Sequence, residues 1–222
     1  MMGGFQLKVC GLTTAPDAAM AAQLGAEFLG FIFYPKSPRA ITVGAFRAMA
    51  DRLPGIHKVA VCVEPSTLHL TALAGSGCQY LQIHFRPETP YAQLAAWSAQ
   101  VGPERLWLAP KLPPGAEIAP GWLPLAHTFL IDTYDPEKFG GTGRTGDWAR
   151  FARLQQANPK RTWILSGGLN AENVGEAVLQ SGAHFVDVNS GVESAPGVKD
   201  PAKLEAFVTA LRRRPRASAA GA

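Results

Sequence analysis

Two side chains that can move protons each stand directly after a short apolar run. Cys10 follows residues 7–9, and Asp132 follows residues 129–131. A thiol has a pKa of about 8.5, which a neighbouring cation or positive dipole lowers, so Cys10 is a candidate base or nucleophile. Partial burial raises the pKa of a carboxyl group, so Asp132 is a candidate general acid. The alternatives are a core cysteine and an aspartate that caps the following turn.

Arg39 is the candidate for binding a carboxylate. It ends the stretch Ser37-Pro38-Arg39, which follows Tyr34-Pro35. The two prolines restrict the backbone of this loop and so limit the directions in which Arg39 points. A planar guanidinium group binds a carboxylate through two parallel hydrogen bonds. An exposed loop arginine without a ligand is the alternative.

Glycine-bearing loops follow three of the later apolar runs, at residues 140–143, 166–169 and 189–192. Glycine lets backbone N–H groups converge on an anion, and the start of a helix adds partial positive charge. We therefore predict a phosphate site built from the last two loops, with the first loop either as a further part of it or as a flexible flap. The candidate residues are Gly141, Gly167, Gly168, Asn189, Ser190 and Gly191.

Eight short apolar runs alternate with helix-like stretches along the whole chain. Most of the runs are continuous rather than alternating, which is typical of strands buried on both faces of a parallel sheet. The predicted strands centre on residues 7–9, 28–33, 58–63, 80–83, 106–109, 128–131, 162–165 and 185–188. The predicted helices span residues 16–24, 43–53, 65–74, 90–100, 147–157, 171–181 and 201–213. Residues 113–124 contain four prolines, so we expect a short or missing helix after the fifth strand.

An internal repeat favours a closed barrel. Residues 25–31, 77–83 and 182–188 share a glycine followed, three residues later, by an aromatic residue that opens an apolar run. If these are strands two, four and eight, the repeating unit is about 26 residues, close to the ~30 of a (β/α)₈ barrel. We therefore predict a single-domain α/β protein, a (β/α)₈ TIM barrel over residues 1–211, with residues 212–222 as a basic, disordered tail. An open doubly wound sheet is the alternative.

Parallel barrels carry their chemistry at the carboxyl ends of the strands. His84 and Asp187 lie at such ends in the fourth and eighth runs. His84 is either a donor that supports the site or a structural histidine. Lys8, inside the first run, is expected to pair with a carboxylate in the barrel rather than to touch a ligand.

Composition and charge exclude several classes of protein. Apolar residues make up 47% of the 222 residues and charged residues 17%, which excludes a disordered chain. Four of the 21 basic residues lie in the last eleven positions, which contain no acid, so residues 1–211 are electrically balanced. This argues against nucleic-acid binding. Three cysteines without metal-ligand spacing, no secretory signal and no long apolar run indicate a cytoplasmic protein with no metal and no membrane contact.

Taken together, the motifs resemble those of phosphoribosylanthranilate isomerase. The matching blocks run in order over nearly the whole chain: residues 8–13 (KVCGLT), 30–39 (GFIFYPKSPR), 82–84 (QIH), 140–143 (GGTG) with 147–148 (DW), 166–169 (SGGL) with 173–174 (NV), and 187–193 (DVNSGVE) with 197–200 (GVKD). The first and last blocks are specific to this family. The resemblance implies isomerisation of N-(5-phosphoribosyl)anthranilate to 1-(2-carboxyphenylamino)-1-deoxyribulose 5-phosphate, an Amadori rearrangement in tryptophan biosynthesis that needs no cofactor.

The resemblance also implies roles for single residues. Asp132 would protonate the furanose ring oxygen and open the sugar to a Schiff base, and Cys10 would then remove the proton from the adjacent sugar carbon. Arg39 would bind the anthranilate carboxylate, the glycine loops the phosphate, and Asp187 the sugar. The implied partner is this small-molecule substrate alone, for a protein that is a monomer or a homodimer.

Two positions depart from the family pattern. Phe85 stands where a small residue is common, which either narrows the mouth near His84 or redirects the loop. Asn189 replaces a more usual serine, so its side-chain contact to phosphate is open. Another phosphosugar enzyme on the same barrel, such as indoleglycerol-phosphate synthase, would require a lysine acid and a glutamate partner at strand ends. A phosphosugar sensor without activity, or a nucleic-acid-binding module that uses the arginine tail, is the alternative from a different class.

Overall fold

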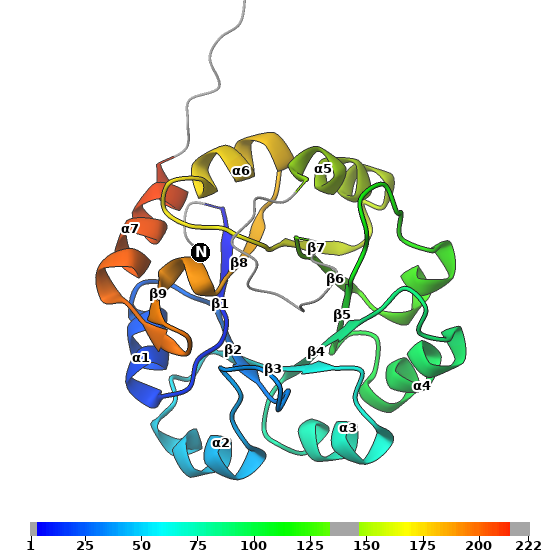
Figure 1. Cartoon of the computed structure of the whole chain (residues 1–222), viewed down its shortest axis with the longest axis horizontal. Helices are drawn as coiled ribbons and strands as arrows, with labels where there is room; N and C mark the ends of the chain where they lie inside the picture. Colours follow the sequence, from blue (N-terminus) through cyan, green and yellow to red (C-terminus); the bar gives the residue numbers. More distant parts are fainter. Residues whose placement is uncertain (1–3, 134–146, 214–222) are drawn as a thin grey trace, which may run out of the picture.

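Eight parallel strands close into one barrel, and each strand pairs with the next in sequence order (Figure 1). The computed structural model describes residues 4–133 and 147–213. Pairing of β8 with β1, in which Lys8 faces Asp187, closes the ring. The prediction of a (β/α)₈ barrel is therefore confirmed. The strands are β1 Gln6–Val9, β2 Phe28–Ile32, β3 His57–Val63, β4 Tyr80–Phe85, β5 Leu106–Pro110, β6 Thr128–Ile131, β7 Thr162–Leu165 and β8 Phe185–Val188.

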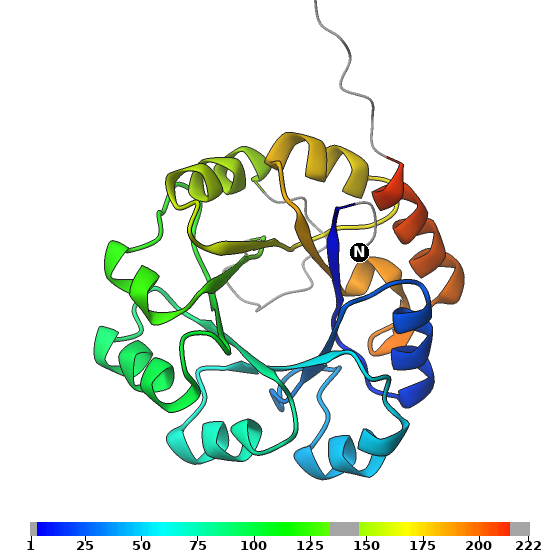
Figure 2. The same cartoon turned by 180° about the vertical axis from the view of Figure 1, so that it is seen from behind.

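The helices form an outer ring around the strands, as both faces of the barrel show (Figures 1 and 2). The first three begin at side-chain caps: Thr14, Thr42 and Ser66 each accept a hydrogen bond from the backbone N–H three residues later. The α-helices are α1 Ala15–Gln23, α2 Val43–Met49, α3 Thr67–Ala74, α4 Tyr91–Val101, α5 Trp148–Ala157, α6 Val174–Ser181 and α7 Pro201–Arg212. A 3₁₀ turn, η1 Ala50–Arg52, extends α2 over the rest of its predicted length.

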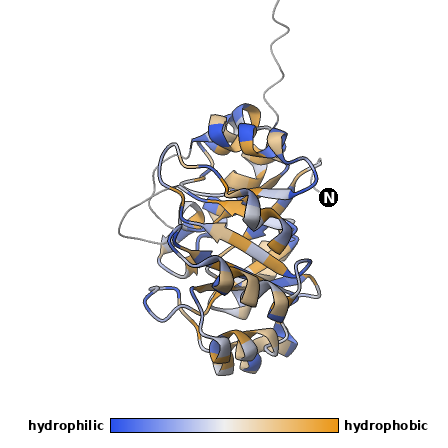
Figure 3. Cartoon of the chain, turned by 90° about the vertical axis from the view of Figure 1, so that its right-hand side faces the viewer, coloured by the Kyte–Doolittle hydropathy of each residue, from blue (hydrophilic) through white to orange (hydrophobic). Residues whose placement is uncertain are grey.

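The connection between β5 and β6, described throughout, contains only the 3₁₀ helix η2 Pro120–Leu125. Its prolines lack the N–H groups that an α-helix needs, which confirms the expectation of a missing helix. Trp122 and Leu125 of η2 are nevertheless buried, so the short element still covers the barrel wall. Figure 3 shows the resulting layers, with hydrophobic strands inside and hydrophilic segments toward the outside.

The internal repeat marks strands two, four and eight, as predicted. Gly25 and Gly77 precede β2 and β4 with φ of 103° and 100°, a backbone conformation that favours glycine. The aromatic residue after each glycine opens the strand and points into the barrel. Phe28 contacts Tyr80 and Phe185 with ring centroids 5.8 and 4.9 Å apart. The repeated aromatic residues thus fill the amino-terminal end of the barrel, opposite the pocket at the carboxyl ends of the strands.

A short hairpin after β8 was not predicted. After the 3₁₀ turn η3 Ser190–Val192, the strands β9 Glu193–Ala195 and β10 Val198–Lys199 pair antiparallel. The Thr13 hydroxyl donates to the Gly197 carbonyl at 2.7 Å, and the Lys199 N–H donates to Asp17 at 3.3 Å. The hairpin after β8 is therefore hydrogen-bonded to the loop after β1 and to the first turn of α1.

The chain's last described segment is α7, which includes Arg212. Residues 214–222 lie outside the described residues, so the disordered tail stays a prediction. Within residues 4–133 and 147–213, no helix has the length and apolar character needed to cross a membrane.

Candidate active site

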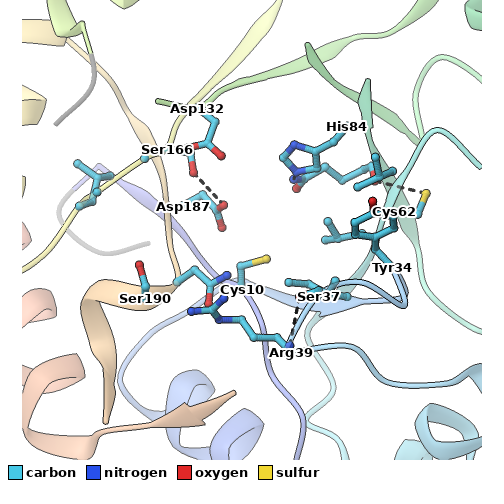
Figure 4. Close-up of a pocket in the computed structure, with 18 residues that line it drawn as sticks. Cys10, Tyr34, Ser37, Arg39, Cys62, His84, Asp132, Ser166, Asp187 and Ser190 are labelled. Carbon is cyan, nitrogen blue, oxygen red and sulfur yellow. Dashed lines mark hydrogen bonds between the residues drawn. The ribbon is translucent and has the colours of Figure 1, made fainter. Parts of the chain in front are cut away.

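One pocket opens at the carboxyl ends of the strands, and nine of the predicted site residues line it (Figure 4). They come from the ends of β1, β4, β6, β7 and β8 and from the loop after β2. These nine are Cys10, Arg39, His84, Asp132, Gly167, Gly168, Asp187, Asn189 and Ser190. Gly191 does not line the pocket, and Gly141 lies outside the described residues.

Cys10 extends β1 by one residue, held by a hydrogen bond from its N–H to the Val188 carbonyl at 2.9 Å. Its side chain points into the pocket (Figure 4). Burial raises the pKa of the thiol, and the neighbouring Lys8 ammonium acts in the opposite direction. The net direction is upward, so the expectation of a lowered pKa for Cys10 is wrong. Burial is the reason, and the extent of burial depends on the folded structure.

Asp132 follows β6 directly and faces the same pocket. Burial, and then the negative charge of Asp187, raise the pKa of its carboxyl group to about 7. The Thr133 N–H donates to Asp132 Oδ1 at 2.8 Å and partly offsets this effect. A carboxyl group with this pKa can donate a proton near neutral pH, as predicted.

Gly167 provides the space for the Asp132 carboxylate. A Cβ atom at Gly167 would lie 2.8 Å from Asp132 Oδ1 and in collision with the backbone N of Thr133, and its φ of 95° strains any other residue. We expect Gly167→Ala to displace the Asp132 carboxyl group and to lower any turnover that depends on it by at least about tenfold, because a displacement of even ~1 Å is costly for a reacting group. Gly77→Ala is the matched control, since it has the same φ class but open space around it. Steady-state kinetics and thermal melts of both variants check this, and equal losses in both would contradict it.

Lys8 pairs with Asp187 inside the barrel, which confirms the expectation for this lysine. Lys8 Nζ lies 2.8 Å from Asp187 Oδ1, and the lysine is fully buried. The Ser166 hydroxyl donates to the other oxygen of Asp187 at 3.2 Å. Asp187 is thus held by two partners while its carboxylate still borders the pocket.

Arg39 is held by a residue that sequence reasoning missed. Glu193, at the start of β9, accepts from Arg39 Nε at 3.0 Å and from Nη2 at 2.7 Å. Lys199 also contacts Glu193, at 2.9 Å, and these cations lower the pKa of Glu193 against the effect of its burial. Within the described part of the chain, Arg39 Nη1 donates no hydrogen bond, so this edge of the guanidinium group is available to a ligand. The signal in the sequence was the acid Glu193 at the end of the block 187–193.

The two glycine loops meet at the pocket. Gly167 and Gly168 have φ of 95° and 62°, and their backbone N–H groups make no hydrogen bond to any described residue. Asn173 supports this loop by donating to the Gly168 carbonyl at 2.9 Å, and α6 begins at Val174, three residues after its predicted start. Gly191 has a different role: only a residue without a side chain fits against the Leu169 carbonyl, so the two loops pack together.

The end of β4 contributes His84 and Gln82, another residue that was missed. The Gln82 amide contacts His84 Nε2 at 2.7 Å. Burial, and then the charge of Lys8, lower the pKa of His84 to about 3, so its ring is neutral. Phe85 points the other way and packs against Trp97 and Trp122, with ring centroids 6.2 and 5.2 Å apart. Phe85 therefore does not narrow the mouth.

Comparisons with known proteins agree with this geometry. The family model described as N-(5'phosphoribosyl)anthranilate (PRA) isomerase matches residues 7–210. The N-(5'-phosphoribosyl)anthranilate isomerase of Neisseria gonorrhoeae is 36% identical over 220 residues, which cover 97% of this chain and 100% of that protein. Sequence similarity therefore extends over the whole barrel.

Two solved structures are similar as well. Phosphoribosyl anthranilate isomerase from Thermus thermophilus has a TM-score of 0.77 at 32% identity, and the match covers 93% of this chain and 98% of that one. A phosphoribosyl anthranilate isomerase in complex with reduced 1-(o-carboxyphenylamino)-1-deoxyribulose 5-phosphate has a TM-score of 0.72 at 27% identity, covering 94% and 98%. The residues matched by the family model include the strands that carry Cys10, His84 and Asp187. This chain belongs to the N-(5'-phosphoribosyl)anthranilate isomerase family.

Proposed function

We propose that this chain isomerises N-(5-phosphoribosyl)anthranilate to 1-(2-carboxyphenylamino)-1-deoxyribulose 5-phosphate, with Cys10 as the base and Asp132 as the acid. The observation that carries the proposal is that both residues line one pocket together with a carboxylate-binding arginine and two glycine loops. The family assignment supports the reaction, and the solved relative with a reduced product analogue supports the class of ligand.

In the first step, protonated Asp132 gives its proton to the furanose ring oxygen. The bond between this oxygen and the anomeric carbon breaks, and the anthranilate nitrogen supplies the electron pair for a Schiff base. The thiolate of Cys10 then takes the proton from the neighbouring sugar carbon, which yields an enolamine. The enolamine tautomerises to the ketone, and proton exchange restores Cys10 and Asp132. The product has the same atoms as the substrate, so no oxidant or reductant is required.

The two anionic ends of the substrate would hold the sugar between the acid and the base. Nη1 of Arg39 faces the anthranilate carboxylate, while the backbone N–H groups of Gly167 and Gly168 and the Ser190 region receive the phosphate. Asp187 contacts the sugar. Fixing both ends orients the reacting carbons without a further loss of entropy at the chemical step. The Gly141 loop is proposed as an additional phosphate contact.

We expect Arg39→Met to lower kcat/KM by about a hundredfold, mainly through KM, because a charge-assisted pair to the carboxylate is lost. The matched control is Arg86→Met, which removes an arginine that pairs with Glu64 at 2.6 Å outside this pocket. Initial rates over a range of substrate concentrations check both variants. A KM of Arg39→Met equal to that of the native chain would remove Arg39 from the binding site.

The decisive experiment adds the purified chain to freshly prepared phosphoribosylanthranilate and follows the loss of anthranilate-type fluorescence. Pretreatment with iodoacetamide should abolish the signal change, since the base would be blocked. Fluorescence loss no faster than the uncatalysed rate would refute the proposed function. The three free thiols fit a reducing compartment, so we propose that the protein works in the cytoplasm, as a monomer or a homodimer.

A further inference from the structure

The buried ion pair between Lys8 and Asp187 lies between the two groups that the proposed function uses. Lys8 and Asp187 are direct neighbours across the β1–β8 ladder, and their charged atoms are 2.8 Å apart. Both side chains are at least nine-tenths buried. A buried ion pair of this kind is weak support for stability, since neutral residues of similar volume often serve as well. Its position therefore points to a role other than folding.

The cationic end of the pair is next to Cys10. Lys8 and Cys10 are two residues apart on one strand, so both side chains point into the barrel. Gly30 on β2 leaves the space in which they meet. A Cβ atom at Gly30 would lie 2.9 Å from Cys10 Sγ and 3.0 Å from Lys8 Cε. Cys10 Sγ and Lys8 Cε are therefore near neighbours. The charge of Lys8 opposes the rise that burial causes in the pKa of Cys10.

The anionic end of the pair is directed toward Asp132. Ser166 lies between the strand ends that carry the two acids: its N–H donates to the carbonyl of Ile131, the residue before Asp132, and its hydroxyl donates to the Asp187 carboxylate. Figure 4 shows Asp187 on the side of the pocket that also holds Ser166 and Asp132. After burial, Asp187 is the larger contribution to the raised pKa of Asp132, and Lys8 acts against it. For the pKa of Cys10 the order of the two charges is reversed, since Lys8 has a larger effect than Asp187.

We propose that the Lys8–Asp187 pair is a fixed dipole that favours the protonation states which the mechanism uses and so raises the population of the active form. Its cation favours the Cys10 thiolate, and its anion favours protonated Asp132. This inference rests on the proposed function, because it assigns a source to the charges which that mechanism needs. Lys8 is a positioning residue: it acts through Cys10 and Asp187 and does not touch the substrate.

The other charged groups around the pocket contribute less to this field. His84 on β4 is neutral because its pKa is lowered to about 3. Lys199 on β10 also lowers the pKa of Cys10, but less than Lys8 does, and its ammonium group is engaged with Glu193 at 2.9 Å and with the Asn189 side chain at 3.1 Å. Arg39 is likewise bound to Glu193. The Lys8–Asp187 pair is therefore the charged element that acts directly on both catalytic groups.

The dipole has a measurable consequence in the pH profile of kcat/KM. With the pKa of Asp132 at about 7 and that of Cys10 raised above its ordinary value, the active form is a minor one with a thiolate and a protonated acid. The profile then rises to a plateau with the titration of Asp132 and falls with that of Cys10. The height of the plateau depends on the separation of the two pKa values, which the dipole makes smaller.

The test uses the neutral double variant Lys8→Met/Asp187→Asn, which removes the dipole without leaving an unpaired buried charge. Alkylation of Cys10 by iodoacetamide, followed by peptide mass spectrometry, should slow by about tenfold at pH 8, because less thiolate is present. The rising limb of the kcat/KM profile should move to lower pH, because Asp132 becomes more acidic. The phosphate of the substrate titrates identically in both proteins. A purely structural role would leave both the alkylation rate of Cys10 and the position of the rising limb of the kcat/KM profile unchanged.

The single variant Asp187→Asn gives a result of opposite sign. It keeps the cation and removes the anion, so Cys10 should be alkylated faster than in the native chain. Cys62 is the internal control for folding, since it is fully buried and its pKa is raised by burial alone. If Cys62 becomes reactive in the double variant, that variant is not correctly folded, and the alkylation rate of Cys10 in the single variant then tests the proposal. Slower or unchanged alkylation of Cys10 in Asp187→Asn would overturn the proposal, whereas fluorescence loss no faster than the uncatalysed rate with the native chain would instead overturn the proposed function.

Discussion

Replacement of Cys10 by serine is expected to lower kcat by several powers of ten while the barrel stays folded. A serine hydroxyl is nearly the same size as a thiol but holds its proton far more tightly, so it cannot accept one from the sugar carbon near neutral pH. Cys10 is 4% exposed and contributes its thiol to the pocket, so the change removes little packing. Fluorescence kinetics give kcat, and circular dichroism melts report on the fold.

Cys78→Ala is the matched control for this prediction. Cys78 is also a buried thiol, with a pKa raised to about 11 by burial, but it lies away from the pocket. Its loss should reduce stability slightly and leave kcat within about twofold of the native value. If Cys10→Ser turned over substrate at a near-native rate, another group would have to be the base, and the assignment of Cys10 would be wrong.

Replacement of Asp132 by asparagine is expected to abolish turnover and at the same time to stabilise the protein above pH 7. An amide is isosteric with the acid but cannot donate an acidic proton to the ring oxygen, so kcat should again fall by several powers of ten. Asp51→Asn, on the exposed turn η1, is the matched control and should leave kcat unchanged.

The gain in stability follows from the direction of the pKa shift. The pKa of Asp132 is about 7 in the folded chain, above the roughly 3.9 of an unfolded aspartate. The folded state therefore resists ionisation, and the native chain loses stability as the pH rises from about 4 to 7. The melting temperature of Asp132→Asn should exceed that of the native chain at pH 8, and the difference should vanish near pH 4. A variant less stable than the native chain at pH 8 would show that Asp132 is structural.

Local patterns in the sequence were sufficient for the architecture. Continuous apolar runs predicted all eight strands, because a strand covered on both faces has little room for polar residues. The prolines at residues 113–124 predicted the missing helix, since proline acts on its own backbone. The spacing of Gly25, Gly77 and their aromatic partners predicted a repeating unit of barrel length, because each glycine marks the turn before a strand. Each of these features depends on only a few neighbouring residues, so it can be predicted without knowledge of the fold.

The pairing of residues far apart in the chain was decided by tertiary structure. The sequence indicated that Arg39 binds a carboxylate, but the closed barrel seats Glu193, 154 positions away, beside it. The position of Lys8 suggested a buried carboxylate without saying which one, and only strand closure places Asp187 opposite. The upward shift of the pKa of Cys10 was likewise hidden, because desolvation depends on every atom around the thiol. Sequence alone thus determined which chemical groups this protein has and where along the strands they stand, whereas their partners and protonation states depend on how the barrel closes and excludes water.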